Sequence, residues 1–344
     1  MGAPDDIAPP PATVPLPAWH GPARAALRKS GLAAAALLAA ALVAPFFLRG
    51  FLVFQLTMVM IYAIAILGLN LLTGIGGQFS LGHSAFFALG AYAAALLMEF
   101  AAWPYWAALP AAALLSGLAG VVFGLPAQRL ANLYLALATY GLALAMPQIL
   151  KLPPLEPWTG GVQGLLVVKP DPPFGLPLTQ DQWLYDLTLV IGLVAYLGAR
   201  NLVASRTGRA MMAIRDNPIA ARAMGVDVEL YKTLSFGVSA LYAGLAGALA
   251  AIVVQFVAPD SFTFTLSVGL FVGLVVGGVG WLPGALAGGA FVLFVPNLAE
   301  SVSKGLSGAV YGTLLILLVH VLPSGLGSLV RAVRLRLRSG PRKI

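Results

Sequence analysis

Long stretches without a charged side chain dominate the pattern of hydrophobic and polar positions along the chain. A membrane-spanning helix needs about 20 apolar residues, and each charged side chain near mid-bilayer costs about 2.5–3.5 kcal/mol. Two uncharged intervals, 50–98 and 261–299, have room for two spans each. A weaker interval, 187–199, reaches spanning length only when Trp183 to Asp186 are included. Intervals for one span each are 30–48, 99–129, 130–150, 233–259 and 305–330.

These intervals predict an all-α polytopic membrane protein with about ten transmembrane helices. Only helices and closed barrels satisfy the backbone in lipid, and the apolar runs lack the strict alternation of barrel strands. Glycines at spacings of four within 269–289 favour close packing between two of these helices. The composition agrees, because 60% of the residues are hydrophobic and only 9% are charged. Such values exclude a soluble globular protein.

Basic residues gather in three places: 1–30, 200–232 and 331–343. With ten spans, both termini and the loop after the sixth span fall on one side, which the excess of Lys and Arg predicts to be cytoplasmic. The segment 151–186 faces the opposite side, and its many prolines predict an ordered loop without long helices. The apolar stretch 31–48 resembles a signal peptide but is longer than a usual signal core, which favours a retained first span.

These observations divide the chain into three parts. A disordered proline-rich cytoplasmic arm is expected over 1–30, and a basic cytoplasmic tail over 329–344. The membrane domain occupies 31–328 and contains the cytoplasmic loop 200–232.

A cluster of polar side chains interrupts the uncharged interval 50–98 among several glycines. Glycines allow a helix to break, and the freed backbone groups must then face protein or a water-filled path. A half-helix starting after Gly82 would present N–H groups to an anionic group such as a carboxylate. The alternative is that the polar groups pair between packed helices, and for the histidine such pairing is the expected state. The candidates for a substrate path are Asn70, Gln78, Ser80, His83 and Ser84.

The loop 200–232 carries signals for two short helices. Asn217 suits an N-cap, Pro218 the first helical position and Gly225 the stop, which together predict a helix over 218–224. A second helix near 208–216 would place Arg209, Arg215 and Asp216 beside apolar residues. Such helices can lie in a groove of a partner protein or on anionic lipid, and the residues alone favour neither.

Signals for enzymatic chemistry are missing from the sequence. It contains no G-x-x-x-x-G-K-[ST] phosphate-binding loop, no G-x-S-x-G and no H-E-x-x-H. There is no cysteine, and the three histidines lie too far apart in sequence for a local metal motif. We therefore expect no catalytic residues, no metal and no cofactor. If ATP powers this protein, another subunit hydrolyses it.

Several segments match a known family: GLNLLTG (68–74), GQFSLGHSAFF (77–87), LYLALAT (133–139) and the loop 208–225. In these segments the chain resembles the permease subunit of branched-chain amino acid ABC importers, in its LivM-like branch, over about residues 50–328.

The resemblance implies that the loop after the middle spans couples the permease to ATP-hydrolysing subunits. It also implies a homologous second permease, two ATP-binding cassette subunits, a soluble substrate-binding protein and an inner-membrane location. The coupling residues would be Arg209, Arg215, Asp216, Asn217, Pro218 and Gly225.

The competing class is a secondary transporter or channel driven by an ion gradient. It would be expected to keep a charged group within the membrane, whereas Glu99, Asp260 and Glu300 lie at predicted span ends. The sequence leaves several substrates open: branched-chain amino acids, other amino acids, small amides and urea.

Overall fold

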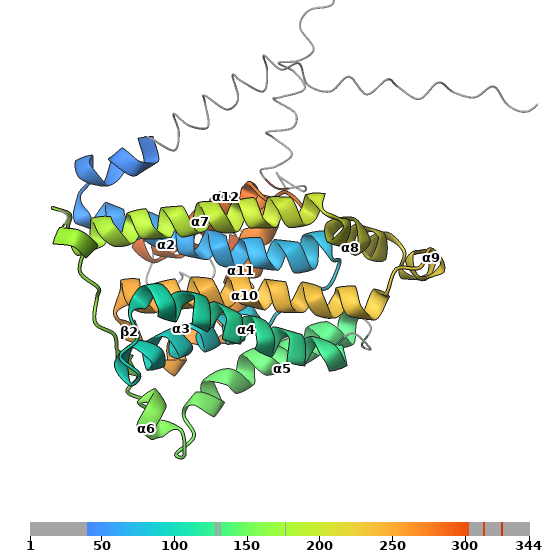
Figure 1. The fold of residues 1–344 in the computed structure, drawn as a ribbon, viewed down its shortest axis with the longest axis horizontal. Coiled ribbons are helices and arrows are strands. Elements are labelled where there is room, and N and C mark those ends of the chain that lie inside the picture. The colour runs from blue at the N-terminus through green and yellow to red at the C-terminus, as the bar shows by residue number, and fades with distance from the viewer. Residues whose placement is uncertain are drawn as a thin grey trace, which may run out of the picture. The chain divides into compact units, whose positions relative to one another are not determined.

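The computed structural model describes residues 40–127, 130, 132–175, 177–302, 312–313 and 325. It divides the chain into two units, 1–47 and 48–344. In the first unit, residues 40–47 are described and are helical. All labelled elements belong to the second unit, which is almost entirely helical (Figure 1).

The first half of this unit contains α2 (Gly50–Leu69), the π-helix η1 (Asn70–Ile75), α3 (His83–Glu99), α4 (Tyr105–Ala127), α5 (Asn132–Leu150), α6 (Glu156–Thr159), the strand β1 (Leu165–Leu166) and the 3₁₀-helix η2 (Pro173–Gly175). The second half contains α7 (Gln180–Ala204), α8 (Arg206–Asp216), α9 (Pro218–Ala223), α10 (Val228–Val254), the strand β2 (Phe256–Val257), the 3₁₀-helix η3 (Pro259–Phe262), α11 (Phe264–Gly277) and α12 (Gly284–Val302).

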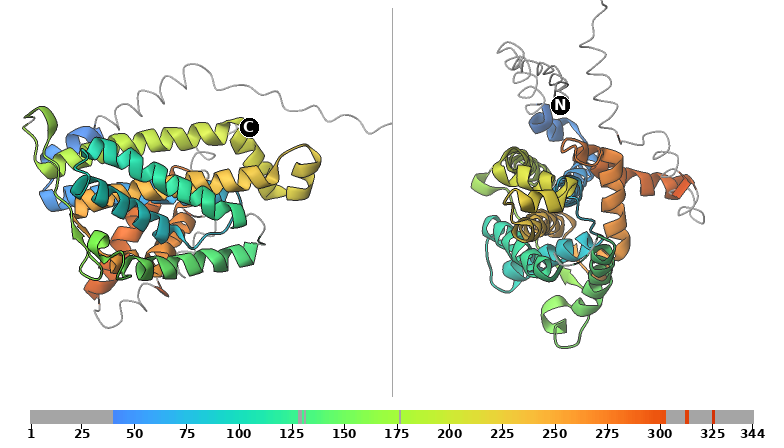
Figure 2. Two further views of the ribbon diagram at one scale, coloured as in Figure 1. Left: turned by 60° about the horizontal axis from the view of Figure 1, so that its bottom comes forward. Right: turned by 90° about the vertical axis from the view of Figure 1, so that its right-hand side faces the viewer.

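The long helices α4, α7 and α10 all run lengthwise, with α4 packed against α10 and α7 packed against α2 (Figure 1). At one end α8 and α9 project beyond them, which is also visible in the left-hand view of Figure 2. At the other end lie α6 and the antiparallel pair β1–β2, in which Leu165 is paired with Val257. We refer to these as the α8–α9 end and the β1–β2 end.

Six helical segments within the described residues are long and apolar enough to cross a membrane, and two shorter apolar helices accompany them. This confirms the prediction of a helical polytopic membrane protein. The predicted count of about ten spans is not confirmed, because 30–48 and 305–330 lie largely outside the described residues. The six are Gly50–Ile75, Tyr105–Pro126, Leu133–Leu150, Gln180–Ala204, Val228–Val254 and Pro259–Gly277, and the two shorter ones are His83–Glu99 and Gly284–Glu300.

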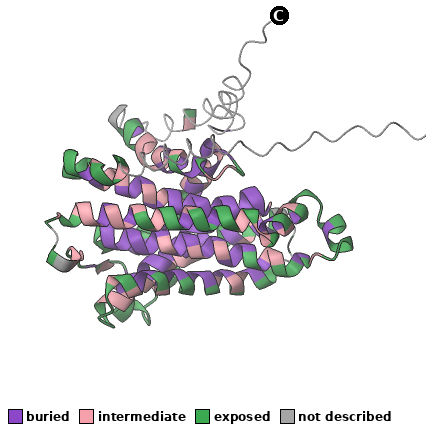
Figure 3. Ribbon diagram, turned by 45° about the horizontal axis from the view of Figure 1, so that its top comes forward, coloured by how far each residue is buried: buried purple, intermediate pink, exposed green. Residues whose placement is uncertain are grey.

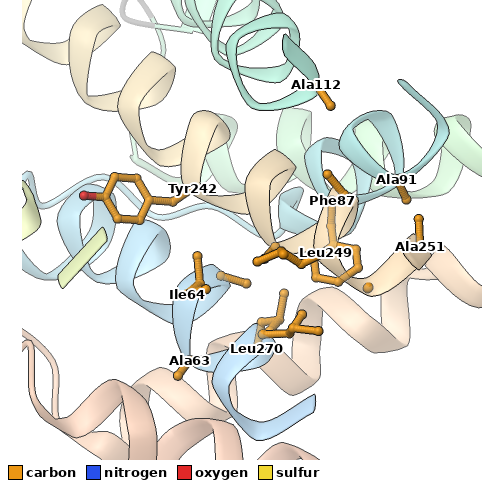
Figure 4. Close-up of a cluster of buried hydrophobic side chains, with 14 of the residues drawn as sticks. Ala63, Ile64, Phe87, Ala91, Ala112, Tyr242, Leu249, Ala251 and Leu270 are labelled. Atoms are coloured by element: carbon orange, nitrogen blue, oxygen red, sulfur yellow. The ribbon is translucent and has the colours of Figure 1, made fainter. Parts of the chain in front are cut away.

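Helix α10 lies at the centre of the unit and packs against α2, α3 and α4. Buried residues concentrate on these inner helices, whereas exposed residues cover the outer faces and the α8–α9 end (Figure 3). Figure 4 shows Phe87, Leu249 and Leu270, from three different helices, meeting beside Ile64 of α2. Association of helices in lipid depends on such close packing, because lipid tails are as apolar as the side chains.

Glycines set the shortest distances between helices. A Cβ at Gly90 of α3 would lie 2.0 Å from the carbonyl oxygen of Gly244 in α10, and one at Gly277 would lie 2.3 Å from that of Gly284. The backbones of α11 and α12 therefore touch at Gly277 and Gly284. This confirms helix packing for the glycines within α11 and α12, whereas Gly278 and Gly280 have positive φ and belong to the turn between these helices.

The connection between α5 and α7 contains only the short elements α6, β1 and η2 among its described residues. Its prolines prevent longer helices, as predicted. Lys151 forms an ion pair with Asp260 at 2.5 Å, and Lys169 forms one with Asp181. Thr179 and Gln182 form a reciprocal capping box at the start of α7, which fixes where this helix begins.

Candidate functional site

The helix that begins at Gly50 breaks within the polar, glycine-rich segment. Its last turn widens into the π-helix η1, and α3 begins only at His83. Between them the chain turns at Gly77, whose φ is +69°. Single π-helical turns inside α-helices are frequent at functional sites. The predicted helix break is therefore confirmed, and the polar candidates lie on both sides of it.

Asn70 joins η1 to the turn between α11 and α12. Its Nδ2 donates a hydrogen bond to the carbonyl of Trp281 at 3.2 Å, and its Oδ1 accepts one from the N–H of Gly280 at 2.8 Å. Gly74 is required beside it, because a Cβ there would lie 2.1 Å from Asn70 Oδ1. The amide of Asn70 thus uses both its ends to hold a turn that lies 210 residues away in sequence.

Gln78 closes the turn after η1. Its N–H donates to the carbonyl of Leu72 at 3.1 Å, and its own carbonyl accepts from the hydroxyl of Thr73 at 2.9 Å. Its side-chain Nε2 donates to the carbonyl of Lys232 in α10 at 3.3 Å. The side-chain Oε1 is buried and has no hydrogen-bond partner within the described residues.

His83 lies in a chain of hydrogen bonds that joins three helices. Ser239 of α10 donates its single hydroxyl proton to the carbonyl of Gly68 at 2.7 Å, so its oxygen must accept from His83 Nε2, which is also 2.7 Å away. We assign the Nε2–H tautomer from this pattern. Nδ1 is then the acceptor that faces the Ser80 hydroxyl at 3.4 Å. Both ring nitrogens thus face a polar partner, which agrees with a paired interior histidine.

Ser84 fastens the start of α3 to α11. Its N–H donates to Ser267 Oγ at 2.8 Å, and the Ser267 hydroxyl donates to Ser84 Oγ at 2.8 Å. One of the N–H groups that could have met an anionic substrate is therefore already bonded. The N–H of Leu81, just before this helix, donates to Thr139 of α5 at 2.9 Å.

All five candidates for the substrate path are at most 3% exposed. In this conformation they bond to neighbouring backbone and side chains, which is the packing alternative. Their role in lining a path stays a prediction. A cavity of about 100 Å³ lies near the β1–β2 end, but none of the five lines it; its walls include Tyr62, Phe87, Val254 and Leu266.

The α8–α9 end folds as the local signals predict. Ser205 caps α8 by accepting from the N–H of Gly208. Asn217 Oδ1 accepts from the N–H groups of Ile219 and Ala220, each at 3.0 Å. Gly225 follows α9 with a φ of +81°. The predicted helices 208–216 and 218–224 are thus confirmed to within two residues at each boundary.

This end presents a mixed apolar and basic surface. Ile219 and Met224, on and after α9, are 83% and 84% exposed, and Arg222 lies between them. Next to them is a cavity of about 420 Å³ whose walls include Arg206, Arg209, Gly225 and Tyr231. No local sequence pattern marks Ile219, Met224 or Tyr231 as surface or cavity residues. In α9 the buried residue is Ala221, and which face of a short helix is buried depends on packing that its boundaries do not reveal.

Arg215 brings the two predicted sites together. Its Nη1 donates a hydrogen bond to the carbonyl of Gly74 in η1 at 3.0 Å, across 141 residues of sequence. Its Nε and Nη2 both donate to Asp216 Oδ1, at 3.0 and 2.9 Å. A Cβ at Gly77 would lie 2.5 Å from Arg215 Cγ, so the arginine stem rests directly on this glycine. Helix α8 and the helix break are therefore in direct contact.

Residues 51–319 match the family described as branched-chain amino acid transport system / permease component. The chain belongs to this family. It is 32% identical over 310 residues to the high-affinity branched-chain amino acid transport system permease protein LivM of Salmonella typhimurium, covering 83% of this chain and 72% of that protein. The LivM protein of Escherichia coli is 31% identical with the same coverage.

A probable branched-chain amino acid transport permease protein LivH of Methanocaldococcus jannaschii is 30% identical over 127 residues, which is 37% of each chain. No solved structure matches. The relatives are transport permeases and not enzymes, which agrees with the missing catalytic motifs. The resemblance noted in the sequence is confirmed, and both the helix break and α8–α9 fall inside the matched range.

Proposed function

We propose that this chain forms part of the translocation path for branched-chain amino acids in an ABC importer of the bacterial inner membrane. Separate subunits would bind and hydrolyse the ATP. One observation carries the proposal. Within the residues that match this family, the exposed helix pair α8–α9 bonds directly to the break in a membrane span, through Arg215 and Gly74.

The arrangement of the subunit follows from the charge distribution. Ten spans with both termini and α8–α9 in the cytoplasm agree with the excess of Lys and Arg in these segments. The partners would be a homologous second permease, two ATP-binding cassette subunits and a soluble substrate-binding protein. Support for the second permease is the separate similarity to a LivH protein.

The ATPase subunit would contact the outer surface of α8–α9. Arg209, Asp216, Asn217, Pro218 and Gly225 lie on this helix pair or form its turns. The exposed apolar residues Ile219 and Met224 would give such a contact its hydrophobic centre. Lipid alone explains this surface less well, because α8–α9 projects beyond the ends of the spanning helices (Figure 1).

The substrate path would run past the helix break. A zwitterionic amino acid has no net charge, so hydroxyl, amide and imidazole groups suffice for its passage. Asn70, Gln78, Ser80, His83 and Ser84 would exchange their present bonds for bonds to substrate or water when the helices move apart. Among the described residues, the buried Oε1 of Gln78 has no hydrogen-bond partner and could accept such a bond at once.

The test is transport by the purified permeases reconstituted with their ATPase and binding-protein partners in lipid vesicles. We expect ATP hydrolysis that L-leucine stimulates, and uptake of L-leucine that requires ATP. Replacing Arg215, Asp216 and Asn217 together by alanine should abolish this stimulation. Uptake in vesicles that contain no ATPase subunit would contradict the proposal.

One observation favours the alternative, a transporter driven by an ion gradient. Asp186 lies inside the candidate span Gln180–Ala204, and its Oδ1 is buried with no hydrogen-bond partner within the described residues. Asp186 as a whole is partly buried, and a carboxylate inside a span is a common site for proton or cation coupling. If this alternative holds, Asp186→Asn will abolish uptake driven by a proton or sodium gradient. If the ABC importer proposal holds, ATP-dependent uptake will persist in this variant.

A further inference from the structure

The π-helix η1 is held at two points four residues apart. At Gly74 its carbonyl accepts a hydrogen bond from Arg215 of α8. At Asn70 its side chain bonds to Gly280 and Trp281, in the turn that joins α11 to α12. Thus η1 lies between the projecting helix pair and the turn, and it is bonded to both.

Helix α8 and the turn after η1 are packed so closely that there is no room for a side chain between them. Gly77 has a positive φ, and any Cβ there would lie 2.5, 3.0 and 3.2 Å from Cγ, Cβ and Cα of Arg215. The arginine backbone and stem therefore press on the turn that follows η1. A displacement of α8 toward the membrane must push this turn, and a displacement away must pull on the bond to Gly74.

The guanidinium of Arg215 is oriented for its bond to Gly74. Asp216 accepts from both Nε and Nη2 and so fixes the plane of the group, which leaves Nη1 directed at the carbonyl. Carbonyl groups near a helix end lack a partner within the helix, and a charged donor gives the stronger kind of hydrogen bond. The bond is therefore strong enough for a movement of α8 to displace the Gly74 carbonyl, and with it η1.

We propose that Arg215 is a positioning residue that transmits the movement of α8 to the break in the membrane span. It acts on η1 and not on the ATPase subunit. Through Asn70, the movement continues to the α11–α12 turn, so that α8, η1 and this turn move together. The inference rests on the proposed function and names the residue through which coupling passes.

The experiment compares variants of the complete importer reconstituted in vesicles, with L-leucine as substrate. Arg215→Met keeps an unbranched stem against Gly77 but removes the donors. We expect the amount of leucine transported per ATP hydrolysed to fall by about tenfold or more, because the charge-assisted hydrogen bond to Gly74 is lost. Arg215→Lys, which keeps one charged donor, should restore part of this ratio.

A control and a second variant separate coupling from folding. Arg49→Met removes an exposed arginine whose side chain makes no capping bond at the start of α2, and it should leave the ratio unchanged. Asn70→Ala breaks the other link and should lower the ratio in the same way. The double variant of Arg215 and Asn70 should be no worse than the worse single variant, because both act in one chain of contacts.

The outcomes are distinct. A normal ratio of transport to hydrolysis in Arg215→Met, in an importer whose wild type works, overturns the inference. If Arg215→Met does not assemble, a normal ratio in Asn70→Ala overturns it instead. An equal loss of ATPase binding in Arg215→Met and in Arg209→Met also overturns it, because Arg215 would then belong to the docking surface. A wild-type importer without leucine-dependent ATP hydrolysis contradicts the proposed function itself.

Discussion

The crossing of α3 and α10 offers the sharpest test of the packing. At this crossing a Cβ on Gly90 would lie 2.0 Å from the carbonyl oxygen of Gly244, and one on Gly247 would lie 1.9 Å from that of Phe87. Both obstacles are helix backbone, so rotation of a side chain relieves neither. The two helices would have to part by about 1 Å or more before the contacts became ordinary, and every other contact along the crossing would then weaken.

Gly90→Ala and Gly247→Ala should therefore each destabilise the folded protein. Overpacking of a tight interior costs about 1–3 kcal/mol, and the rigid obstacle places these variants at the upper end. The better helix propensity of alanine offsets at most about 1 kcal/mol. Unfolding in detergent, followed by helical circular dichroism against denaturant or temperature, measures the difference.

Gly141→Ala is the matched control. It makes the same substitution inside helix α5, but a Cβ at this exposed position meets no atom within 4 Å. It should leave stability unchanged or raise it by up to about 1 kcal/mol. If Gly90→Ala and Gly247→Ala unfold at the same denaturant concentration or temperature as Gly141→Ala, the two helices do not cross as closely as described.

Three further experiments test other parts of the structure. Asn217→Ala removes both cap bonds of α9, so stability should fall by about 1 kcal/mol and amide hydrogen exchange over 218–223 should quicken. His83→Leu should cost about 1–3 kcal/mol in denaturant unfolding because it leaves buried hydroxyls without their partner. Ser80→Ala loses only two long contacts of 3.4 Å each, with His83 Nδ1 and with the N–H of Gly82, and should cost less. Lys151→Glu places a like charge beside Asp260 and should lower the melting temperature. Adding Asp260→Lys restores an ion pair with reversed charges and should bring the melting temperature back up.

The features predicted correctly from the sequence depend on short-range chemistry. The helix break follows from glycines and polar residues within a few positions of one another. The pair α8–α9 follows from an Asn-Pro start and a glycine stop, each acting on its nearest backbone groups. Such signals need no knowledge of what the segment packs against.

The partners of the polar residues could not be predicted in this way. Ser239, which bonds to His83, lies 156 residues away, and Ser267, which bonds to Ser84, lies 183 residues away. Both serines lie in ordinary apolar helices, and no local pattern distinguishes a serine that pairs across an interface from one that bonds within its own helix. The contact between Arg215 and Gly74 escaped prediction for the same reason.

If the five candidate residues line a path, as we propose, they must do so in a conformation other than the described one. The five candidates are buried and bonded in the described conformation, and a buried polar group without a partner is costly. A path can open beside them only if helix movement breaks these bonds while substrate or water replaces them. Their bonds run from η1 to the α11–α12 turn, from α3 to α10 and from α3 to α11, so separating these elements would free the polar groups in sets. Arg215 is bonded to the first of these elements, which is where a pull on α8 would begin to separate them.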